Sequence, residues 1–235
     1  MKIILAEDTS YMKEEIIFTL KKFKNEGNLI GDEKRNIVKF FNLTDSTLNF
    51  KLFRQRNILN RQGYKLYRKS KARLSFEHAQ FLISKNFHTP KPVAYIERYD
   101  FSGLAANYYI SEQLNNSTIF TEILDDLSFT DREKIIRQYA SLMYELHNNG
   151  IEFVDNSPGN FLVKRIKKEY LIYLVDLDKI NFYDKIKTKK RLKNLAKLTK
   201  NIEILKIIAS EYSALSGIPE DYCLKKMSKA STINI

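Results

Sequence analysis

The alternation of apolar and polar residues predicts a strand-rich region in the first half of the chain. Short apolar runs separated by turns indicate three antiparallel strands near residues 27–31, 36–42 and 47–53. A further strand is expected over 107–112, while residues 11–24 carry a modest helical or mixed pattern. This order favours a small antiparallel sheet in the N-terminal part of the chain.

Helical periodicity accounts for two longer segments. Ser70 is placed to cap a helix that runs over residues 70–85. Thr130 and Glu133 have the spacing of a capping box, which predicts a helix that opens there and ends near His147. We interpret His147 as a structural hydrogen-bonding residue rather than a catalyst.

After residue 178 the pattern is helical and basic. Residues 186–213 repeat Leu and Ile at helical spacing, and Pro219 opens a last short helix. Between Lys179 and Lys229 there are thirteen basic and five acidic residues. A basic amphipathic region is typical of a surface that faces phosphates or a membrane, although a solvated helix face is the default explanation.

The stretch 151–178 carries the densest cluster of chemically active side chains. Within it, Phe161–Ile166 and Tyr170–Val175 are apolar runs separated by the short charged segment Lys167-Lys168-Glu169. Two such runs with a short polar break predict a β-hairpin.

A hairpin brings its outer ends together, so Asn160 is expected to lie near Asp176. Asp155, five residues before Asn160, lies on the loop that enters the first strand of the hairpin. Carboxylate and amide oxygens gathered in this way suit a hard divalent cation such as Mg²⁺. The order D-x-x-x-x-N, strand pair, D is that of a kinase active site, with Asp155 catalytic and Asn160 and Asp176 on the metal.

Two charged residues earlier in the chain are candidates for the nucleotide phosphates. Lys51 lies on the third predicted strand, and Glu77 lies in the middle of the 70–85 helix. A lysine on such a strand usually faces solvent, and a mid-helix glutamate is usually a surface residue. Together they form the strand lysine and helix glutamate that hold nucleotide phosphates in kinases.

Other backbone positions are candidates for nucleotide contacts. Gly27 and Gly31 sit at the first predicted turn and could let backbone N–H groups approach phosphates, although an ordinary hairpin would also use them. Residues 112–114 form a connector between the two halves. A crossing of this kind leaves backbone N–H and C=O groups free to bind an adenine edge, here at Glu112 and Leu114.

Charge indicates an anionic partner. The 235 residues carry a formal net charge of +12 and a pI near 9.5. Nine Lys or Arg residues and no Asp or Glu lie between Thr47 and Ser75, so the basic stretch 51–73 is either a solvated connector or an anionic contact. Nucleic acid, anionic lipid and a phosphorylated substrate would all satisfy this charge.

Cysteine content and hydropathy indicate a cellular compartment. Cys223 is the single cysteine, so an internal disulfide is impossible and a reducing cytoplasm is expected. We interpret it as a packed residue. No apolar run reaches the roughly 18–20 residues of a membrane span, and the N-terminus turns acidic too early for a signal peptide. We therefore expect a soluble or peripheral protein.

The order of these residues resembles the protein-kinase-like superfamily, and within it the bacterial lipopolysaccharide core kinases, the Kdo kinase and heptose kinase group. The resemblance runs from roughly residue 35 to 200. The matching stretches are NFKLF, YRKSKARLSFEHAQFL, TPKPVAYIE, YYISEQL, LHNNGIEFVDNSPGNFLV, YLVDLDKINF and KKRLKNLAKL.

The resemblance implies an α+β, protein-kinase-like bilobal fold. Its N-lobe, expected over residues 1–112, would be a small antiparallel sheet with one main helix, and its C-lobe, over 113–235, mostly helical. It implies ATP and Mg²⁺ as cofactors and lipid A-linked Kdo or heptose as acceptor. A peripheral position at the cytoplasmic face of the inner membrane, on an anionic surface and without nucleic acid, follows from the same family.

Three positions depart from the kinase pattern. Phe153 stands where kinases commonly have histidine, Asn156 stands where an apolar residue is usual, and Asp178 replaces the glycine of D-F-G. Phe153 and Asn156 keep open an inactive kinase-like binding protein. A kinase that acts on a protein or small-molecule hydroxyl is a further alternative, as is a nucleic-acid-binding protein, which would explain the charge alone.

Overall fold

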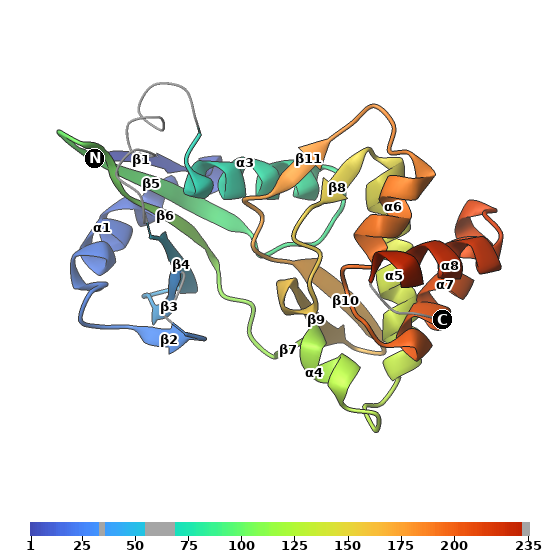
Figure 1. Cartoon of the computed structure of the whole chain (residues 1–235). Helices are drawn as coiled ribbons and strands as arrows, with labels where there is room; N and C mark the ends of the chain where they lie inside the picture. The colour runs from blue at the N-terminus through green and yellow to red at the C-terminus, as the bar shows by residue number, and fades with distance from the viewer. Residues whose placement is uncertain (33–35, 55–68, 232–235) are drawn as a thin grey trace. The chain divides into compact units, whose positions relative to one another are not determined.

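The computed structural model describes residues 1–32, 36–54 and 69–231, and Figure 1 shows the chain. The chain divides into two compact units, Met1–Asn115 and Asn116–Ile235. Residues 55–68 of the basic stretch 51–73 lie outside the described residues, so its anionic contact stays a prediction.

The first unit is built on a six-stranded antiparallel sheet, and the three strands predicted in the first half are present in it (Figure 1). The predicted 107–112 strand begins earlier, at Gly103. In spatial order the strands are β1 (Lys2–Leu5), β5 (Pro92–Asp100), β6 (Gly103–Glu112), β4 (Thr47–Phe53), β3 (Asn36–Asn42) and β2 (Asn28–Ile30).

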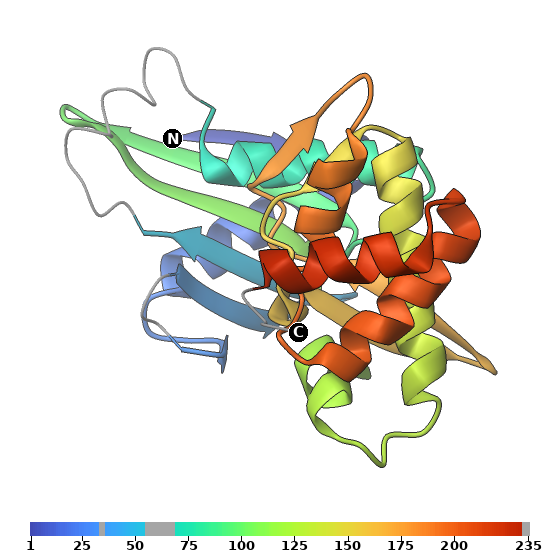
Figure 2. The ribbon, with the colours of Figure 1, turned by 45° about the vertical axis from the view of Figure 1, so that its right-hand side comes forward.

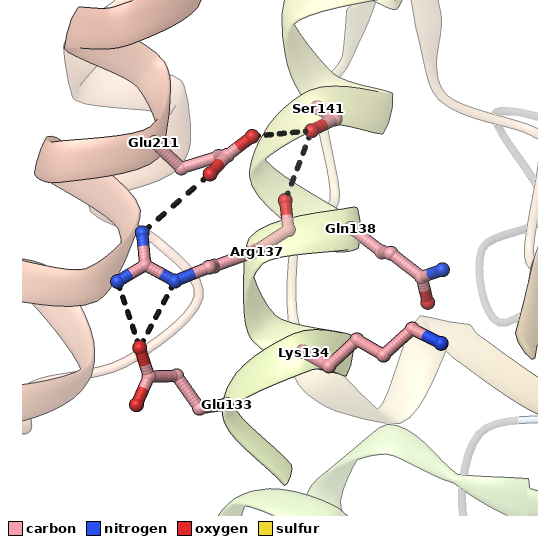
Figure 3. Close-up of a pocket in the computed structure, with 6 residues that line it drawn as sticks. All are labelled: Glu133, Lys134, Arg137, Gln138, Ser141 and Glu211. Carbon is pink, nitrogen blue, oxygen red and sulfur yellow. Dashed lines mark hydrogen bonds and ion pairs between the residues drawn. The ribbon is translucent and has the colours of Figure 1, made fainter. Parts of the chain in front are cut away.

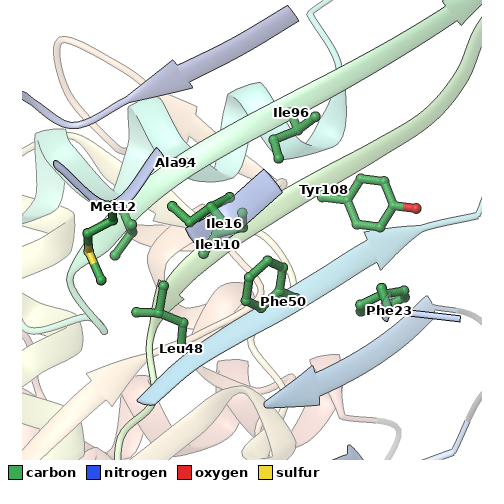
Figure 4. Close-up of a cluster of buried hydrophobic side chains, with 10 residues drawn as sticks. Met12, Ile16, Phe23, Leu48, Phe50, Ala94, Ile96, Tyr108 and Ile110 are labelled. Atoms are coloured by element: carbon green, nitrogen blue, oxygen red, sulfur yellow. The ribbon is translucent and has the colours of Figure 1, made fainter. Parts of the chain in front are cut away.

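The alternation along β4 assigns its side chains to the two faces of this sheet. Leu48 and Phe50 belong to a buried cluster that also contains residues of the 3₁₀ helix η1 (Glu7–Met12) and of α1 (Lys13–Lys22), as Figure 4 shows. Phe53 packs instead with residues of α3 (Lys71–Ser84). Lys51, two residues before Phe53, therefore lies on the face that α3 covers.

The second unit combines small sheets with a helical bundle (Figure 2). Its strands are β7 (Ser117–Ile119), β8 (Ile151–Phe153), β9 (Phe161–Ile166), β10 (Glu169–Leu174) and β11 (Ile180–Phe182), and η2 (Pro158–Asn160) is a 3₁₀ turn. Its helices are α4 (Phe120–Asp125), α5 (Arg132–Asn148), α6 (Thr188–Leu195), α7 (Ile202–Ser216) and α8 (Glu220–Ala230). Strands β9 and β10 form the predicted hairpin, and α7 packs against α5 and α8. Within the described ranges, no helix combines the length and apolar character needed to cross a bilayer.

Two helix boundaries differ from the sequence-based expectation. The capping box at Thr130 and Glu133 is wrong: α5 starts after Asp131, whose φ of 60° is left-handed, and the described residues provide no side-chain cap at this end. Glu133 instead accepts hydrogen bonds from Arg137, one turn later in the helix. The apolar repeat over 186–213 is split into α6 and α7, because the Asn201 side chain caps a new helix start.

Candidate functional site

The predicted catalytic and metal residues of the second unit are brought together around the β9–β10 hairpin. The Val175 N–H donates to the Asn160 carbonyl at 3.0 Å, which holds Asn160 beside the residue before Asp176. The Asn160 side-chain amide donates to the backbone carbonyl of Asp155 at 2.8 Å. The convergence of Asp155, Asn160 and the start of the Asp176 segment follows from the hairpin, as expected.

Lys179 binds the predicted catalytic carboxylate directly. Its Nζ lies 3.0 Å from Asp155 Oδ2. The hydrogen bond to Asp155 raises the pKa of Lys179, and the negative charges of Asp178 and Asp176 act in the same direction. One ammonium therefore lies within electrostatic reach of all three carboxylates. Sequence reasoning did not single out Lys179, although the D-L-D-K segment that contains it was part of the family resemblance.

The backbone at Asp176 adopts an uncommon conformation. Its φ is 62°, in the left-handed region that most side chains avoid and that Asp and Asn tolerate best. Such conformations cost free energy and collect at functional sites. The outlier falls on the residue that the motif assigned to the metal, which supports a functional reason for it.

The donor set of this site suits Mg²⁺. The Asn160 Nδ2 is committed to the Asp155 carbonyl, which leaves Oδ1 as the ligand atom of that amide. Mg²⁺ is usually bound by one or two carboxylates together with substrate phosphates, so Asn160 and Asp176 would suffice. Across the described part of the chain, no group of three or more His, Cys, Asp or Glu residues is placed to hold a metal.

A buried polar network holds the loop that carries Asp155. Asn156, 1% exposed, accepts a hydrogen bond from the Tyr139 hydroxyl at 2.9 Å and donates to the Asn194 carbonyl at 2.7 Å. The Asn194 side chain donates to the Phe153 carbonyl at 2.9 Å. The Phe153 ring itself packs against Phe161 in the core. Asn156 and Asn194 thus fix the loop whose usual histidine is missing.

His147 extends this network and is confirmed as a hydrogen-bonding residue. Its Nε2 lies 3.1 Å from the Asn194 Oδ1, and its Nδ1 lies 3.0 Å from the Tyr212 hydroxyl. Because the Asn194 Nδ2 is a donor to Phe153, its Oδ1 accepts, so Nε2 carries the proton. Burial lowers the pKa of His147 to about 4, so the ring is neutral at pH 7 and Nδ1 accepts from Tyr212.

Stability is therefore expected to fall in mild acid. The unfolded chain takes up a proton at the ordinary histidine pKa of 6.5, while the folded chain resists protonation until its pKa of about 4. Between these values the unfolded state binds more protons, so the free energy of unfolding decreases as the pH falls, by about 3 kcal/mol across the window. Urea unfolding at a series of pH values measures this loss.

The variant His147→Gln is expected to be less stable at neutral pH and to show a shallower slope between pH 6.5 and 4. A His147→Gln profile parallel to wild type would contradict a neutral buried imidazole.

In the first unit, Lys51 lies as described on the α3 side of the sheet, with its Nζ 5.1 Å from the centre of the Phe53 ring. Glu77 accepts hydrogen bonds from Lys69 Nζ at 2.7 Å and Arg73 Nε at 2.8 Å. Partial burial works against ionisation, but these two bonds lower the pKa of Glu77. Lys69 and Arg73 bind the Glu77 carboxylate, and Glu77 as the partner of Lys51 stays a prediction.

Gly27 and Gly31 flank β2 with positive φ values of 95° and 70°. A Cβ at Gly27 would collide with the Phe41 ring, while the space around Gly31 is open. Close packing thus explains Gly27 without a ligand, and the phosphate contact of both glycines stays a prediction.

Two backbone N–H groups of the connector 112–114 already donate hydrogen bonds within the first unit. The N–H groups of Glu112 and Gln113 donate to the carbonyls of Lys91 and Thr47, each at 2.9 Å. The expectation that the connector leaves its N–H groups open is wrong for these two, because the sheet extends through them. An adenine edge would need other backbone groups, and the roles of Glu112 and Leu114 stay predictions.

A hollow between α5 and α7, shown in Figure 3, is closed by charge pairs of its own. Arg137 donates to Glu133 at 2.7 Å and lies 3.5 Å from Glu211, which also accepts from Ser141 at 3.1 Å. These contacts join the two helices and account for Glu133, Arg137, Ser141 and Glu211 without a ligand.

An antiparallel sheet with a covering helix in one unit, and an Asp–Asn–Asp loop and hairpin in the other, define a protein-kinase-like fold. A structure described as WaaP in complex with acyl carrier protein is 16% identical, with 99% of this chain and 95% of that chain covered and a TM-score of 0.65. The Rio2 kinase–ADP/Mg²⁺–phosphoaspartate complex from Chaetomium thermophilum is 13% identical, with 97% and 80% covered and a TM-score of 0.53. The predicted α+β kinase-like fold is confirmed.

The family follows from the sequence itself. The model of the lipopolysaccharide kinase (Kdo/WaaP) family matches residues 24–217, so the chain belongs to this family. The family resemblance and the kinase class are thereby confirmed. A comparison with curated protein sequences finds no match.

Proposed function

We propose that the chain transfers the γ-phosphate of ATP, in the presence of Mg²⁺, to a sugar hydroxyl of the lipopolysaccharide inner core. The acceptor would be a Kdo or heptose residue linked to lipid A. The family supports a phosphotransferase acting on lipopolysaccharide. The observation that carries the proposal is the convergence of Asp155, Asn160 and the Asp176 segment on one edge of the hairpin.

Each residue of this edge has a role in the proposed reaction. Asp155 would orient the acceptor hydroxyl and accept its proton, while Lys179, bonded to Asp155 Oδ2, fixes that carboxylate. Asn160 and Asp176 would hold Mg²⁺, which neutralises charge on the phosphates when bound. Placement is critical in this chemistry, because an error of about 1 Å can cost roughly a hundredfold in rate.

The remaining roles concern the nucleotide. Lys51 would neutralise charge on the α- and β-phosphates, with Glu77 as its proposed support. Gly27 and Gly31 would approach the phosphates, and Glu112 and Leu114 the adenine, through backbone groups.

The proposed acceptor and location come from the family resemblance, and the net charge is consistent with both. A net charge of +12 suits an anionic glycolipid and an anionic membrane surface, and we propose a peripheral position at the cytoplasmic face of the inner membrane. No nucleic-acid partner is needed to account for the charge.

The geometry of the loop that carries Asp155 removes the main argument for an inactive kinase-like binding protein. Phe153 and Asn156 raised it because they depart from the kinase pattern. Both are accounted for by packing and hydrogen bonding: Phe153 fills the core, and Asn156 binds Tyr139 and Asn194. An ordered loop with Asp155 at its tip favours an active kinase.

The proposal is tested by incubating the protein with Mg²⁺-ATP and Kdo-lipid A and analysing the lipid by mass spectrometry. We expect one added phosphoryl group on the sugar, and none without Mg²⁺. A parallel reaction supplies a protein acceptor. Phosphorylation of the protein with Kdo-lipid A unchanged would replace the sugar-lipid acceptor by a protein hydroxyl.

A further inference from the structure

A basic hollow lies along α6 in the second unit. Its volume is about 480 Å³. It is lined by Glu152, Lys187, Lys189, Lys190, Lys193, Asn194 and Lys197. Lys189 and Lys193 are four residues apart, so they share one face of α6, and Lys197 follows in the turn after the helix.

The single acid of the hollow is already neutralised. Glu152 lies 3.2 Å from the Lys190 Nζ and also accepts hydrogen bonds from Asn181 at 2.9 Å and Tyr183 at 3.0 Å. Burial works against its ionisation, yet these bonds and the charge of Lys190 lower the pKa of Glu152. Glu152 is therefore ionised, and its charge is neutralised by Lys190 and by its hydrogen bonds to Asn181 and Tyr183.

The other lysines of the hollow have no acid of their own. Lys187, Lys189 and Lys193 are exposed, and within the ranges that the structure describes none of them makes an ion pair. Like charges one turn apart on a helix destabilise it. An exposed, uncompensated group of this kind therefore favours an external anion.

The hollow adjoins the loop that carries the proposed base. The Lys197 Nζ donates to the Val154 carbonyl at 2.8 Å, and Asn194 donates to the Phe153 carbonyl at 2.9 Å. Val154 immediately precedes Asp155, so the lysine face ends at the residue before the catalytic carboxylate. An anion in the hollow would be attached to a molecule that can also reach Asp155.

We infer that this hollow binds an oxyanion of the glycolipid acceptor, a phosphate or a sugar carboxylate, through Lys187, Lys189 and Lys193. Binding there holds the acceptor while its hydroxyl reaches Asp155. The inference rests on the proposed function and adds a second contact for the acceptor. Lys190 and Lys197 act as wall residues, since Glu152 and the Val154 carbonyl occupy them.

The test uses the double variant Lys189→Gln/Lys193→Gln in the full chain. Its matched control is Lys225→Gln/Lys229→Gln on α8, which removes two exposed lysines at the same spacing. With Kdo-lipid A and Mg²⁺-ATP, the α6 variant is expected to raise the KM for the lipid roughly 10- to 100-fold, because charged hydrogen bonds are lost. The KM for ATP and kcat should stay near wild type, as should all constants of the control.

Binding without turnover provides the second readout. Vesicles that contain Kdo-lipid A are compared with vesicles that contain an uncharged glycolipid, by flotation with each protein. Selective loss of binding to the Kdo-lipid A vesicles in the α6 variant supports the inference. Vesicle binding tests the lysine site separately from the proposed phosphoryl transfer, because binding can be measured even if the wild-type chain transfers no phosphate.

Several results would overturn the inference. An unchanged KM for the lipid together with unchanged vesicle binding would refute the inference. An equal loss of lipid binding in both double variants would show only that the net charge of the protein attracts the lipid. A lower kcat with an unchanged lipid KM would assign the lysines to the catalytic loop. Loss of binding to an acidic protein, with the lipid unaffected, would assign the hollow to a protein partner.

Discussion

Replacement of Asp155 by alanine is expected to lower kcat for phosphoryl transfer by about 10²–10⁴-fold, the usual contribution of a positioned acid–base group. Asp155 is held at two points: its backbone carbonyl accepts from the Asn160 amide, and its Oδ2 accepts from Lys179. Without this carboxylate the hydroxyl would lose the group that we propose orients it and accepts its proton. The measurement is kcat with Kdo-lipid A.

Nucleotide binding should survive in Asp155→Ala, because Asn160 and Asp176 keep the proposed metal ligands. The affinity for Mg²⁺-ADP, measured by calorimetry, is expected to stay within about threefold of wild type. Asp184→Ala provides the control, since Asp184 is exposed in the same unit. Wild-type turnover in Asp155→Ala would end its assignment as the base.

Replacement of Asp176 by asparagine is expected to remove the dependence of nucleotide binding on Mg²⁺. Asparagine tolerates the left-handed φ of 62° about as well as aspartate, so the change removes the charge without a new backbone strain. Loss of even an indirect metal contact typically costs 10–100-fold, and a direct ligand should cost at least about 100-fold in activity. The nucleotide affinity is measured with Mg²⁺ and with EDTA.

The stability of Asp176→Asn must be followed in parallel. Its free energy of unfolding should lie within about 1 kcal/mol of wild type, as expected where no core contact changes. The wild type should bind the nucleotide much more tightly with Mg²⁺ than with EDTA, and the variant should bind it equally in both. A variant that keeps the Mg²⁺ enhancement would exclude Asp176 from the metal site.

The part of the site that depends on local pattern could be predicted from the sequence. Two apolar runs and a short charged break determine a hairpin, and a hairpin determines that Asn160 lies beside the segment of Asp176. The strand that carries Lys51 and the start of α3 after Ser70 could be predicted from similarly local patterns. In each case the deciding residues are close together in sequence.

The part of the site that depends on contacts between residues far apart in the sequence could not be predicted. Asn156 and Asn194 are separated by 38 residues, and their hydrogen bond has no periodic signature. His147 was expected to form hydrogen bonds, but its partners Asn194 and Tyr212 could not be named from spacing. A buried polar side chain far along the chain is informative only when its partner is known.

Competition between neighbours explains the wrong capping box at the start of α5. Glu133 has the spacing of a capping residue, yet Arg137 is one turn away and binds its carboxylate. Glu77 likewise has two cations within reach, Lys69 and Arg73, before any contact with the sheet is considered. Sequence spacing indicates which residues are able to contact each other, but the helix geometry determines which of these contacts form.

The most direct measurement is a crystal structure of the chain with Mg²⁺ and a non-hydrolysable ATP analogue. We expect the metal to be bound by Asn160 Oδ1 and the Asp176 carboxylate at about 2.0–2.1 Å, with the Asp155 carboxylate facing the terminal phosphate. A metal–nucleotide complex bound away from Asn160 and Asp176 would contradict the account.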